Sequence, residues 1–248
     1  MSEENIVVMF PDLKGQGVQS SFGGKILHFQ PQAKLIPVLN GLSAGEAQKL
    51  SKKLEGLFFP VTSFGRGLLS TLVDGYQYCL NNFPDHVIVR LDTAEHPVEA
   101  IPALLREIER GADMVIGDLD FSKGCFQYLR ENSIDEFAHL DLFPALYGQF
   151  TRGKLPLSCA HGFQVFAPGK LASIFEEAKN VVAEVEKEVG HVEWGFDGAM
   201  ALSAYHLGMN VEIVKIPAES LRDRPRKKIA EQFDRALWMC RAAEILKK

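Results

Sequence analysis

The chain of 248 residues has few cysteines and no long apolar run. The cysteines are widely spaced and form no C-x-x-C pair, which argues against a disulfide framework and against a cysteine zinc site. No apolar stretch approaches the roughly 20 residues that span a bilayer, and the stretch MSEENIVVMF lacks the basic start and cleavage site of a signal peptide. We expect a cytoplasmic protein that would reach a lipid substrate only from the membrane surface. The cysteines are Cys79, Cys125, Cys159 and Cys240.

An excess of positive charge is also lacking, because the formal net charge is −5. This balance argues against a general nucleic-acid-binding protein. The charge is uneven: ten basic and five acidic residues lie between Lys215 and Lys248, so the rest of the chain is strongly acidic. A local basic patch on an acidic protein suits one anionic ligand better than a polyanion.

Compact apolar runs alternate with amphipathic segments along the chain, without internal repeats or linkers. The runs are continuous, which is typical of strands that are buried on both faces of a sheet. Their alternation with helices predicts one α/β domain over 1–248, built as a three-layer α/β/α sandwich around a mostly parallel sheet. Strands are expected at 5–10 (ending before Pro11), 25–29, 34–39, 57–62, 86–92, 113–118, 162–167 and 210–218. Helices are expected at about 44–56, 68–83, 97–110 and 169–189, in a segment closed by Gly208, and in a last segment that ends near Leu246.

Two acids follow one of these apolar runs, in the stretch LDTAEHP. Asp92 ends the run, and a carboxylate at the C-terminal end of a central strand lies where open α/β sheets bind their ligands. Together with Glu95 it could hold Mg²⁺ or Mn²⁺, which neutralises a pyrophosphate as its bond breaks. In the structural alternative, Asp92 only ends a strand and Glu95 caps the helix that begins near Pro97.

Two other segments suit an anionic ligand. Gly65, Arg66 and Gly67 precede a predicted helix, and the free N–H groups of a helix N-terminus can bind an anion. A turn that only needs glycine is the alternative. Arg222 and Arg224 lie in the densest basic run, and the planar guanidinium fork suits phosphate. The alternative there is a solvated helix start.

Four stretches, taken in order, resemble the inverting family-2-type glycosyltransferases of the GT-A fold, the family that includes dolichol-phosphate mannose synthase. The resemblance covers about residues 57–228, and it depends more on order and spacing than on any one motif. The stretches are SFGRGLLSTLVDGYQYC (63–79), similar to the family's GxGxAxxxG; VIVRLDTAEHPVEAIPALL (87–105), similar to DADxxHxPExIPxLL; LFPALYGQFTRGKLPLSCAHGFQVFAPGKLASI (142–174), similar to the acceptor-side loop and the strand after it; and WGFDGAMALSAYHLGMNVEIVKIPAES (194–220), similar to the segment with the family's fDxE acid.

The resemblance implies a GT-A-like fold, with a nucleotide-sugar-binding half at about 1–120 and an acceptor-side half at about 121–248. It implies transfer of a hexose from a nucleoside-diphosphate sugar, with inversion and with Mg²⁺ or Mn²⁺. The acceptor would be a polyprenyl phosphate, a saccharide or a small phosphorylated molecule, and the protein could form a homo-oligomer. A retaining transferase that acts on a phosphoglycerate-type acceptor is a close variant.

The same resemblance implies roles for single residues. Asp92 and Glu95 would hold the metal and the pyrophosphate. Asp197 would be the base that takes the acceptor proton, with Glu193 as the second choice. An acid before a helix, such as Asp197, is also a good N-cap. The expected donor-binding residues are Pro11, Asn40, Gly65, Arg66, Asp92, Arg222 and Arg224.

The chain departs from the family at its donor motifs. It has FPDLKGQ in place of PxyNE and LNGLSAG in place of DDGSxD, so that Asn40 would offer an amide to the edge of the base. Ala94 stands where the family has its second metal-proximal Asp, and the loop before His96 is one residue shorter.

Two other functions are consistent with the sequence. A sugar-phosphate nucleotidyltransferase on a related sheet would carry a Gly-rich basic loop after its first strand, and residues 11–25 are Gly-rich with two lysines. A catalytically silent nucleotide-sugar-binding protein of transferase ancestry would account for the missing acid at position 94.

Overall fold

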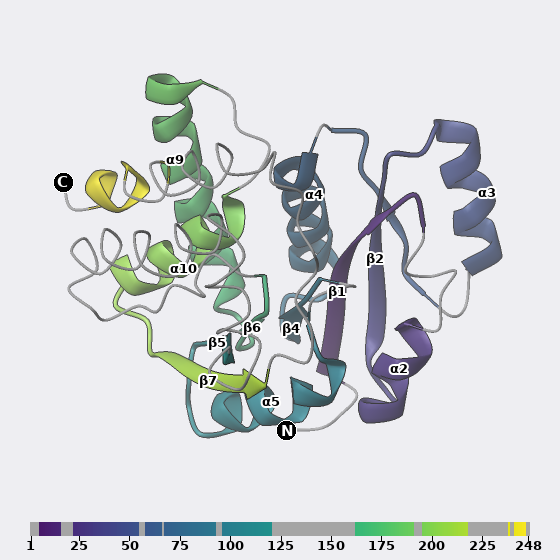
Figure 1. Cartoon of the computed structure of the whole chain (residues 1–248), viewed down its shortest axis with the longest axis horizontal. Coiled ribbons are helices and arrows are strands. Elements are labelled where there is room, and N and C mark those ends of the chain that lie inside the picture. The colour runs from purple at the N-terminus through teal and green to yellow at the C-terminus, as the bar shows by residue number, and fades with distance from the viewer. Residues whose placement is uncertain are drawn as a thin grey trace, which may run out of the picture.

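The computed structural model describes residues 5–15, 22–54, 58–65, 67–92, 96–120, 162–190, 195–217, 238 and 241–246. Within these ranges, strands and helices alternate along the chain (Figure 1). The strands are β1 (Ile6–Leu13), β2 (Lys34–Asn40), β3 (Val61–Thr62), β4 (Val87–Arg90), β5 (Met114–Asp120), β6 (Gln164–Phe166) and β7 (Val211–Pro217). The helices are α2 (Phe22–Phe29), α3 (Ala44–Leu54), α4 (Gly67–Asn82), α5 (Ile101–Glu109), α9 (Leu171–Val189) and α10 (Phe196–His206), with the short 3-10 helix η2 (Val98–Ala100) before α5.

The described strands form a seven-stranded sheet in the order β3-β2-β1-β4-β6-β5-β7. Neighbouring strands are parallel except β6, which is antiparallel to both β4 and β5. After β1 the chain adds β2 and β3 on one side and β4 on the other. The topological switch point, where open α/β sheets bind ligands, therefore lies between β1 and β4.

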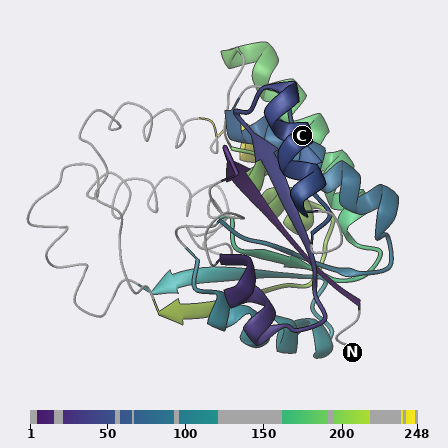
Figure 2. The ribbon, with the colours of Figure 1, turned by 90° about the vertical axis from the view of Figure 1, so that its right-hand side faces the viewer.

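Helices cover both faces of this sheet (Figures 1 and 2). On one face, Met9, Ile88 and Phe166 pack with α4, α9 and α10. On the other face, Val8 and Val89 pack with α2 and α5. Successive residues of a strand point to opposite faces, which is why neighbouring residues of β1 and of β4 enter different cores. The predicted three-layer α/β/α sandwich with a mostly parallel sheet is confirmed.

The predicted end of the first strand is wrong, because β1 continues through Pro11 to Leu13 and pairs there with β2. The pairing of β1 with β4 ends at Met9, whose carbonyl accepts the N–H of Leu91. The backbone groups of successive strand residues point to alternate sides, so the nitrogen of Pro11 faces the β4 side beyond this last bond. The missing N–H of proline therefore removes no hydrogen bond from the sheet.

The predicted strand at 25–29 is also wrong, because this segment belongs to α2. Phe22 and Ile26 lie one helical turn apart, and both are buried in the core between the sheet and helices α2 and α5. Gly23 lets the helix approach Phe58, since a Cβ at this position would lie 2.8 Å from the Phe58 ring. A short apolar stretch is equally compatible with a helix face and with a strand, which is the reason for the error.

The other predicted elements within the described ranges are confirmed, with boundaries shifted by a few residues. At the start of α3, the N–H and the hydroxyl of Ser43 donate to the Glu46 carboxylate at 2.9 and 2.6 Å. The Glu46 N–H donates back to the Ser43 hydroxyl at 3.4 Å, which completes a capping box. These bonds explain why the helix begins where the sequence indicated.

The predicted acceptor-side loop and the basic run at 222–228 lie outside the described residues. The predicted last helix is described only in part, with helical residues at 241–245 and a buried Trp238 beside α9 and α10. Across the described residues, no helix combines the length and apolar character that a membrane span requires.

Candidate functional site

The carboxyl ends of β1, β2 and β4 meet at one edge of the sheet, beside the switch point. Asp92 follows β4 directly after Leu91, and Asn40 is the last residue of β2. Asp12, near the end of β1, is buried at the same edge. Ligands of open α/β sheets bind outside this edge, and it is the candidate site.

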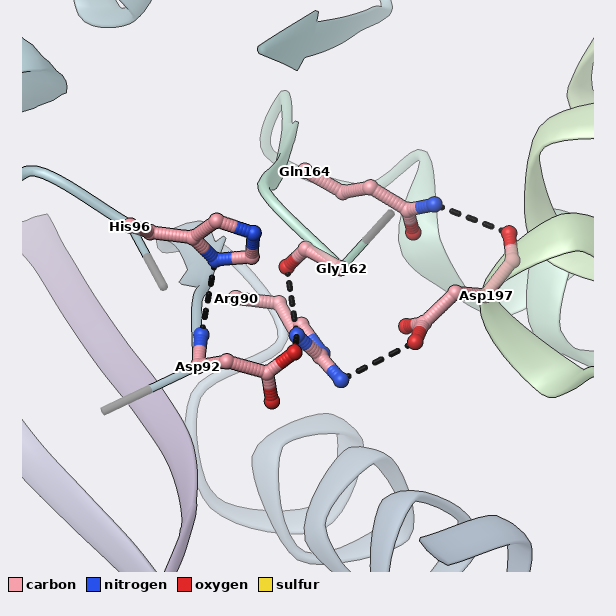
Figure 3. Close-up of polar contacts among 6 residues, drawn as sticks. All are labelled: Arg90, Asp92, His96, Gly162, Gln164 and Asp197. Atoms are coloured by element: carbon pink, nitrogen blue, oxygen red, sulfur yellow. Dashed lines mark hydrogen bonds and ion pairs between the residues drawn. The ribbon is translucent and has the colours of Figure 1, made fainter. Parts of the chain in front are cut away.

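One guanidinium joins three segments of the chain at this edge (Figure 3). Arg90 is the last residue of β4, and its Nη1 donates to the carbonyl of Gly162 at 2.7 Å. The same Nη1 lies 3.1 Å from Oδ2 of Asp92. Nη2 donates to Oδ2 of Asp197, in the first turn of α10, at 2.9 Å. Two acids that were predicted as site residues from distant parts of the sequence therefore share one arginine.

The members of this cluster differ in their exposure. The Arg90 side chain is fully buried, that of Asp197 is 9% exposed, and that of Asp92 is 27% exposed. Burial alone would lower the pKa of Arg90, but the Asp197 and Asp92 carboxylates outweigh it and hold this pKa above its ordinary value. Arg90 therefore stays charged, and Asp92 is the member of the cluster that presents its charge to solvent.

The packing around Arg90 leaves no room for a side chain at Gly162. A Cβ there would lie 1.5 Å from Nη1 and 2.0 Å from Cζ of Arg90. The antiparallel register of β4 and β6 places Gln164 opposite Arg90, and Gln164 Nε2 donates to the backbone carbonyl of Asp197 at 2.8 Å. Polar contacts thereby join β4, β6 and α10 inside the core.

Asp92 is also held through its backbone. Its N–H donates to Nδ1 of His96 at 2.8 Å, so this ring nitrogen carries no proton. The His96 ring is buried and stacks on Phe163, with 5.0 Å between ring centroids and 19° between planes. The loop after β4 therefore fixes the main chain of Asp92 while Arg90 fixes its side chain.

Tyr76 of α4 lies in the core next to Arg90 and Asp197. Its ring packs on Phe196, with 6.0 Å between centroids. Burial, followed by the charge of Asp197, holds the pKa of Tyr76 well above its ordinary value. The hydroxyl makes no hydrogen bond within the described structure. Tyr76 therefore contributes packing as a neutral phenol at neutral pH.

Asn40 and Gly65 contact each other at the carboxyl end of β2, which lies on the far side of β1 from β4. Asn40 Nδ2 donates to the Gly65 carbonyl at 3.2 Å and to the Thr71 hydroxyl at 2.6 Å. A Cβ at Gly65 would lie within 3 Å of Ser70, so the turn into α4 needs glycine. These bonds tie the end of β2 to the start of α4, and the contacts of Asn40 and of Pro11 with a donor stay predictions.

Five predicted site residues lie outside the described ranges, and Asp92 is the described member of the predicted metal pair. Among the described residues, no group of three or more His, Cys, Asp or Glu side chains could hold a metal ion. Asp92 could supply one carboxylate to a cation whose other ligands are phosphate and water, which is a common arrangement for Mg²⁺. The five residues are Arg66, Glu95, Glu193, Arg222 and Arg224.

The sequence prediction missed Arg90, Gly162 and Gln164. A signal for two of them is present, because an arginine interrupts the apolar run VIVRLD and a glutamine interrupts GFQVFA. Polar side chains within buried strands require partners. Which partners they find depends on the order of the strands in the sheet.

The sequence matches no family model and no curated protein. Among solved structures, the chain is similar to a 4-diphosphocytidyl-2C-methyl-D-erythritol synthase from Anaerococcus prevotii DSM 20548, with a TM-score of 0.50, 10% identity, and coverage of 93% of this chain and 95% of the other. It is also similar to a protein of Desulfovibrio desulfuricans G20 that is named as a nucleotide-diphospho-sugar transferase, with a TM-score of 0.48, 11% identity, and coverage of 96% and 97%. The GT-A-like fold class is confirmed. At 10% identity the likeness to the Anaerococcus prevotii structure shows the fold alone.

Proposed function

We propose that this protein is a transferase for nucleoside-diphosphate sugars, which binds the donor at the carboxyl edge of β1, β2 and β4 and moves its hexose to an acceptor with inversion. One observation carries the proposal. Asp92 lies at the switch point of the sheet, is partly exposed, and has its carboxylate held by a buried arginine. A fixed carboxylate at this place suits a cation-bound pyrophosphate.

A divalent cation would be held on the protein side by Asp92, with Glu95 as the second predicted ligand. When bound, such a cation neutralises the charge that develops on the departing nucleoside diphosphate. Asp92 is suited to this role because its backbone bond to His96 and its side-chain contact with Arg90 restrict its orientation.

The base that takes the acceptor proton is proposed to be Glu193 rather than Asp197. Asp197 Oδ2 is paired with Arg90 at 2.9 Å, and its side chain is only 9% exposed. Accepting a proton would remove its charge and leave a buried guanidinium with one counterion fewer, which is costly. Glu193 lies four positions earlier in the same motif.

A nucleotidyltransferase is the second candidate, because the similar Anaerococcus prevotii structure is that of a synthase whose named product carries a diphosphocytidyl group. The two functions share a nucleotide site and differ in the bond that breaks. A glycosyltransferase releases a nucleoside diphosphate. A nucleotidyltransferase transfers the nucleoside monophosphate part of a nucleoside triphosphate to a sugar phosphate, and the bond to the β-phosphate breaks to release pyrophosphate.

Binding is tested first, by thermal unfolding and calorimetry with a panel of nucleoside-diphosphate sugars and Mn²⁺. Ligand at a hundredfold excess over Kd should stabilise the folded state by about 2.7 kcal/mol. Asp92→Asn should weaken binding, whereas Asp85→Asn should not, because Asp85 is an exposed acid in the turn before β4, at the opposite end of the sheet from Asp92. If no donor of the panel binds at millimolar concentration, the transferase proposal is rejected.

Product analysis then separates the candidates. With a donor that binds, the wild-type protein is incubated with polyprenyl phosphate, saccharide and small phosphorylated acceptors, and the nucleoside diphosphate released is measured. Pyrophosphate release from nucleoside triphosphate and sugar phosphate would favour the nucleotidyltransferase. Donor binding without either product would favour a silent binding protein.

A further inference from the structure

We propose that Arg90 is the positioning residue for Asp92: its buried guanidinium orients the carboxylate that faces the nucleoside diphosphate, and Asp197 serves as the counterion that keeps the guanidinium in place. This inference rests on the proposed function, which gives Asp92 its ligand. It assigns Asp197 to the support of the site.

Arg90 acts through its neighbours because it cannot reach a ligand itself. None of its side chain is exposed, whereas more than a quarter of the Asp92 side chain is. The pair therefore extends from the core to the surface, with the positive charge inside and the negative charge at the ligand-binding edge. A ligand or cation at this edge would meet Asp92 and not the guanidinium.

The fork of the guanidinium sets the geometry. Nη1 contacts the Gly162 carbonyl and the Asp92 carboxylate, while Nη2 contacts Asp197. The nitrogens are fixed in one plane, so anchoring at Gly162 and Asp197 determines where Nη1 meets Asp92. A lysine ammonium lacks this planar fork and cannot make all three contacts with the same geometry.

Asp197 is itself held in place, as a fixed counterion must be. It lies in the first turn of α10, and Gln164 Nε2 donates to its backbone carbonyl at 2.8 Å. Gln164 is opposite Arg90 in the register of β4 and β6, so strand pairing aligns both ends of the ion pair. The position of Asp92 thus depends on how α10 docks on the sheet.

The experiment separates positioning from stability by removing both buried charges at once. Arg90→Met alone removes the guanidinium that faces the buried Asp197 carboxylate, and this variant should unfold at a clearly lower temperature. The double variant Arg90→Met/Asp197→Leu replaces the ion pair by apolar side chains, which is often neutral for stability. We expect its unfolding midpoint to lie much closer to that of the wild type. Its affinity for UDP, GDP, CDP or ADP with Mn²⁺, whichever binds the wild type, should fall at least tenfold, as in Asp92→Asn.

A conservative variant and a control complete the design. Arg90→Lys keeps the charge, and we expect it to fold and to lose several-fold in affinity. Lys179→Met breaks an exposed ion pair with Glu176 on α9 and should change neither the midpoint nor the affinity. Wild-type affinity in both the folded double variant and Arg90→Lys would overturn the inference.

A crystal structure of the double variant gives a readout that needs no ligand. The Asp92 carboxylate should leave the position that it has beside Arg90, whereas an unmoved Asp92 would contradict the positioning role. If no nucleoside diphosphate binds the wild type, the proposed function fails, and this structure still decides whether Arg90 positions Asp92. If the double variant does not crystallise, its affinity and that of Arg90→Lys decide together, and wild-type affinity in both overturns the inference.

Discussion

Replacement of Gly162 by alanine tests how tightly the Arg90 guanidinium is packed. The added Cβ would lie 1.5 Å from Nη1 and 2.0 Å from Cζ of Arg90, where ordinary contacts between side chains are about 3.5–4 Å. Gly162 has no positive φ, so alanine meets no backbone strain, and the steric effect is measured alone.

The expected loss of stability follows from these distances. The guanidinium would have to retreat by roughly 2 Å to reach ordinary contact. A movement of that size breaks contacts of 2.7, 2.9 and 3.1 Å with Gly162, Asp197 and Asp92. Overpacking a core costs about 1–3 kcal/mol, and breaking a buried ion pair costs about 3–5 kcal/mol. These terms overlap, and we expect a loss of at least about 3 kcal/mol, a large part of the stability of an ordinary domain.

Urea denaturation at neutral pH measures this loss from the shift of the midpoint at an unchanged slope. Gly24→Ala is the matched control, because a Cβ there meets no atom within 4 Å and the residue lies in α2. This control should raise stability by up to about 1 kcal/mol, since alanine is the better helix former. A Gly162→Ala protein within about 0.5 kcal/mol of the wild type, the range of neutral surface substitutions, would refute the packing argument.

Three further predictions concern single side chains. Hydrogen bonds from the Asn210 N–H and from Lys170 hold the pKa of Asp113 below its usual range, so its contribution to stability is present above about pH 3.9 and is lost as the pH falls through the lowered pKa. Asp113→Asn should cost about 1–2 kcal/mol in urea denaturation at pH 7. This difference should shrink as the pH falls from about 3.9 through the lowered pKa of Asp113, whereas a loss independent of pH would contradict the assignment. Tyr76→Phe should leave stability within about 1 kcal/mol of the wild type or raise it, because the buried hydroxyl makes no hydrogen bond within the described structure; a loss above about 2 kcal/mol would show that it has a partner. In a donor-dependent assay, Glu193→Gln should lower kcat by about 100-fold or more while donor affinity is kept, and a variant with unchanged kcat would exclude Glu193 as the base.

Most of the fold could be predicted because the buried strands are continuous apolar runs and the helices carry clear start and stop signals. The strand at 34–39 is an example, because its apolar run is continuous. The helix that begins after Ser43 is another, because Ser43 and Glu46 form the capping box that marks a helix start. The two errors arose where local pattern is ambiguous. The short segment 25–29, with three apolar residues, belongs to α2. Pro11 is tolerated in β1 because the pairing with β4 has already ended.

From the sequence, the candidate site could be predicted only where a residue follows a strand directly, and not where distant segments meet. Asp92 directly follows an apolar run, so its place at the edge of the sheet could be inferred from sequence. The ion pair that holds Arg90 could not be inferred, because the contact of Arg90 with Asp197 joins residues 107 positions apart. That contact exists only because β6 inserts antiparallel beside β4 and α10 then docks on the same face.

The presence of an arginine inside β4 has no explanation in the stability of the fold alone. A buried ion pair generally stabilises a protein no better than well-packed apolar side chains of similar volume. The neighbours of Arg90 in β4 are valine and isoleucine, and an apolar residue at this position would suit the same core. Such a residue would remove the contact of Arg90 with Asp92 at the edge where open α/β sheets bind ligands. The buried ion pair of Arg90 and Asp197 is therefore best explained by its effect on the partly exposed Asp92, whose carboxylate it holds at the surface of the core.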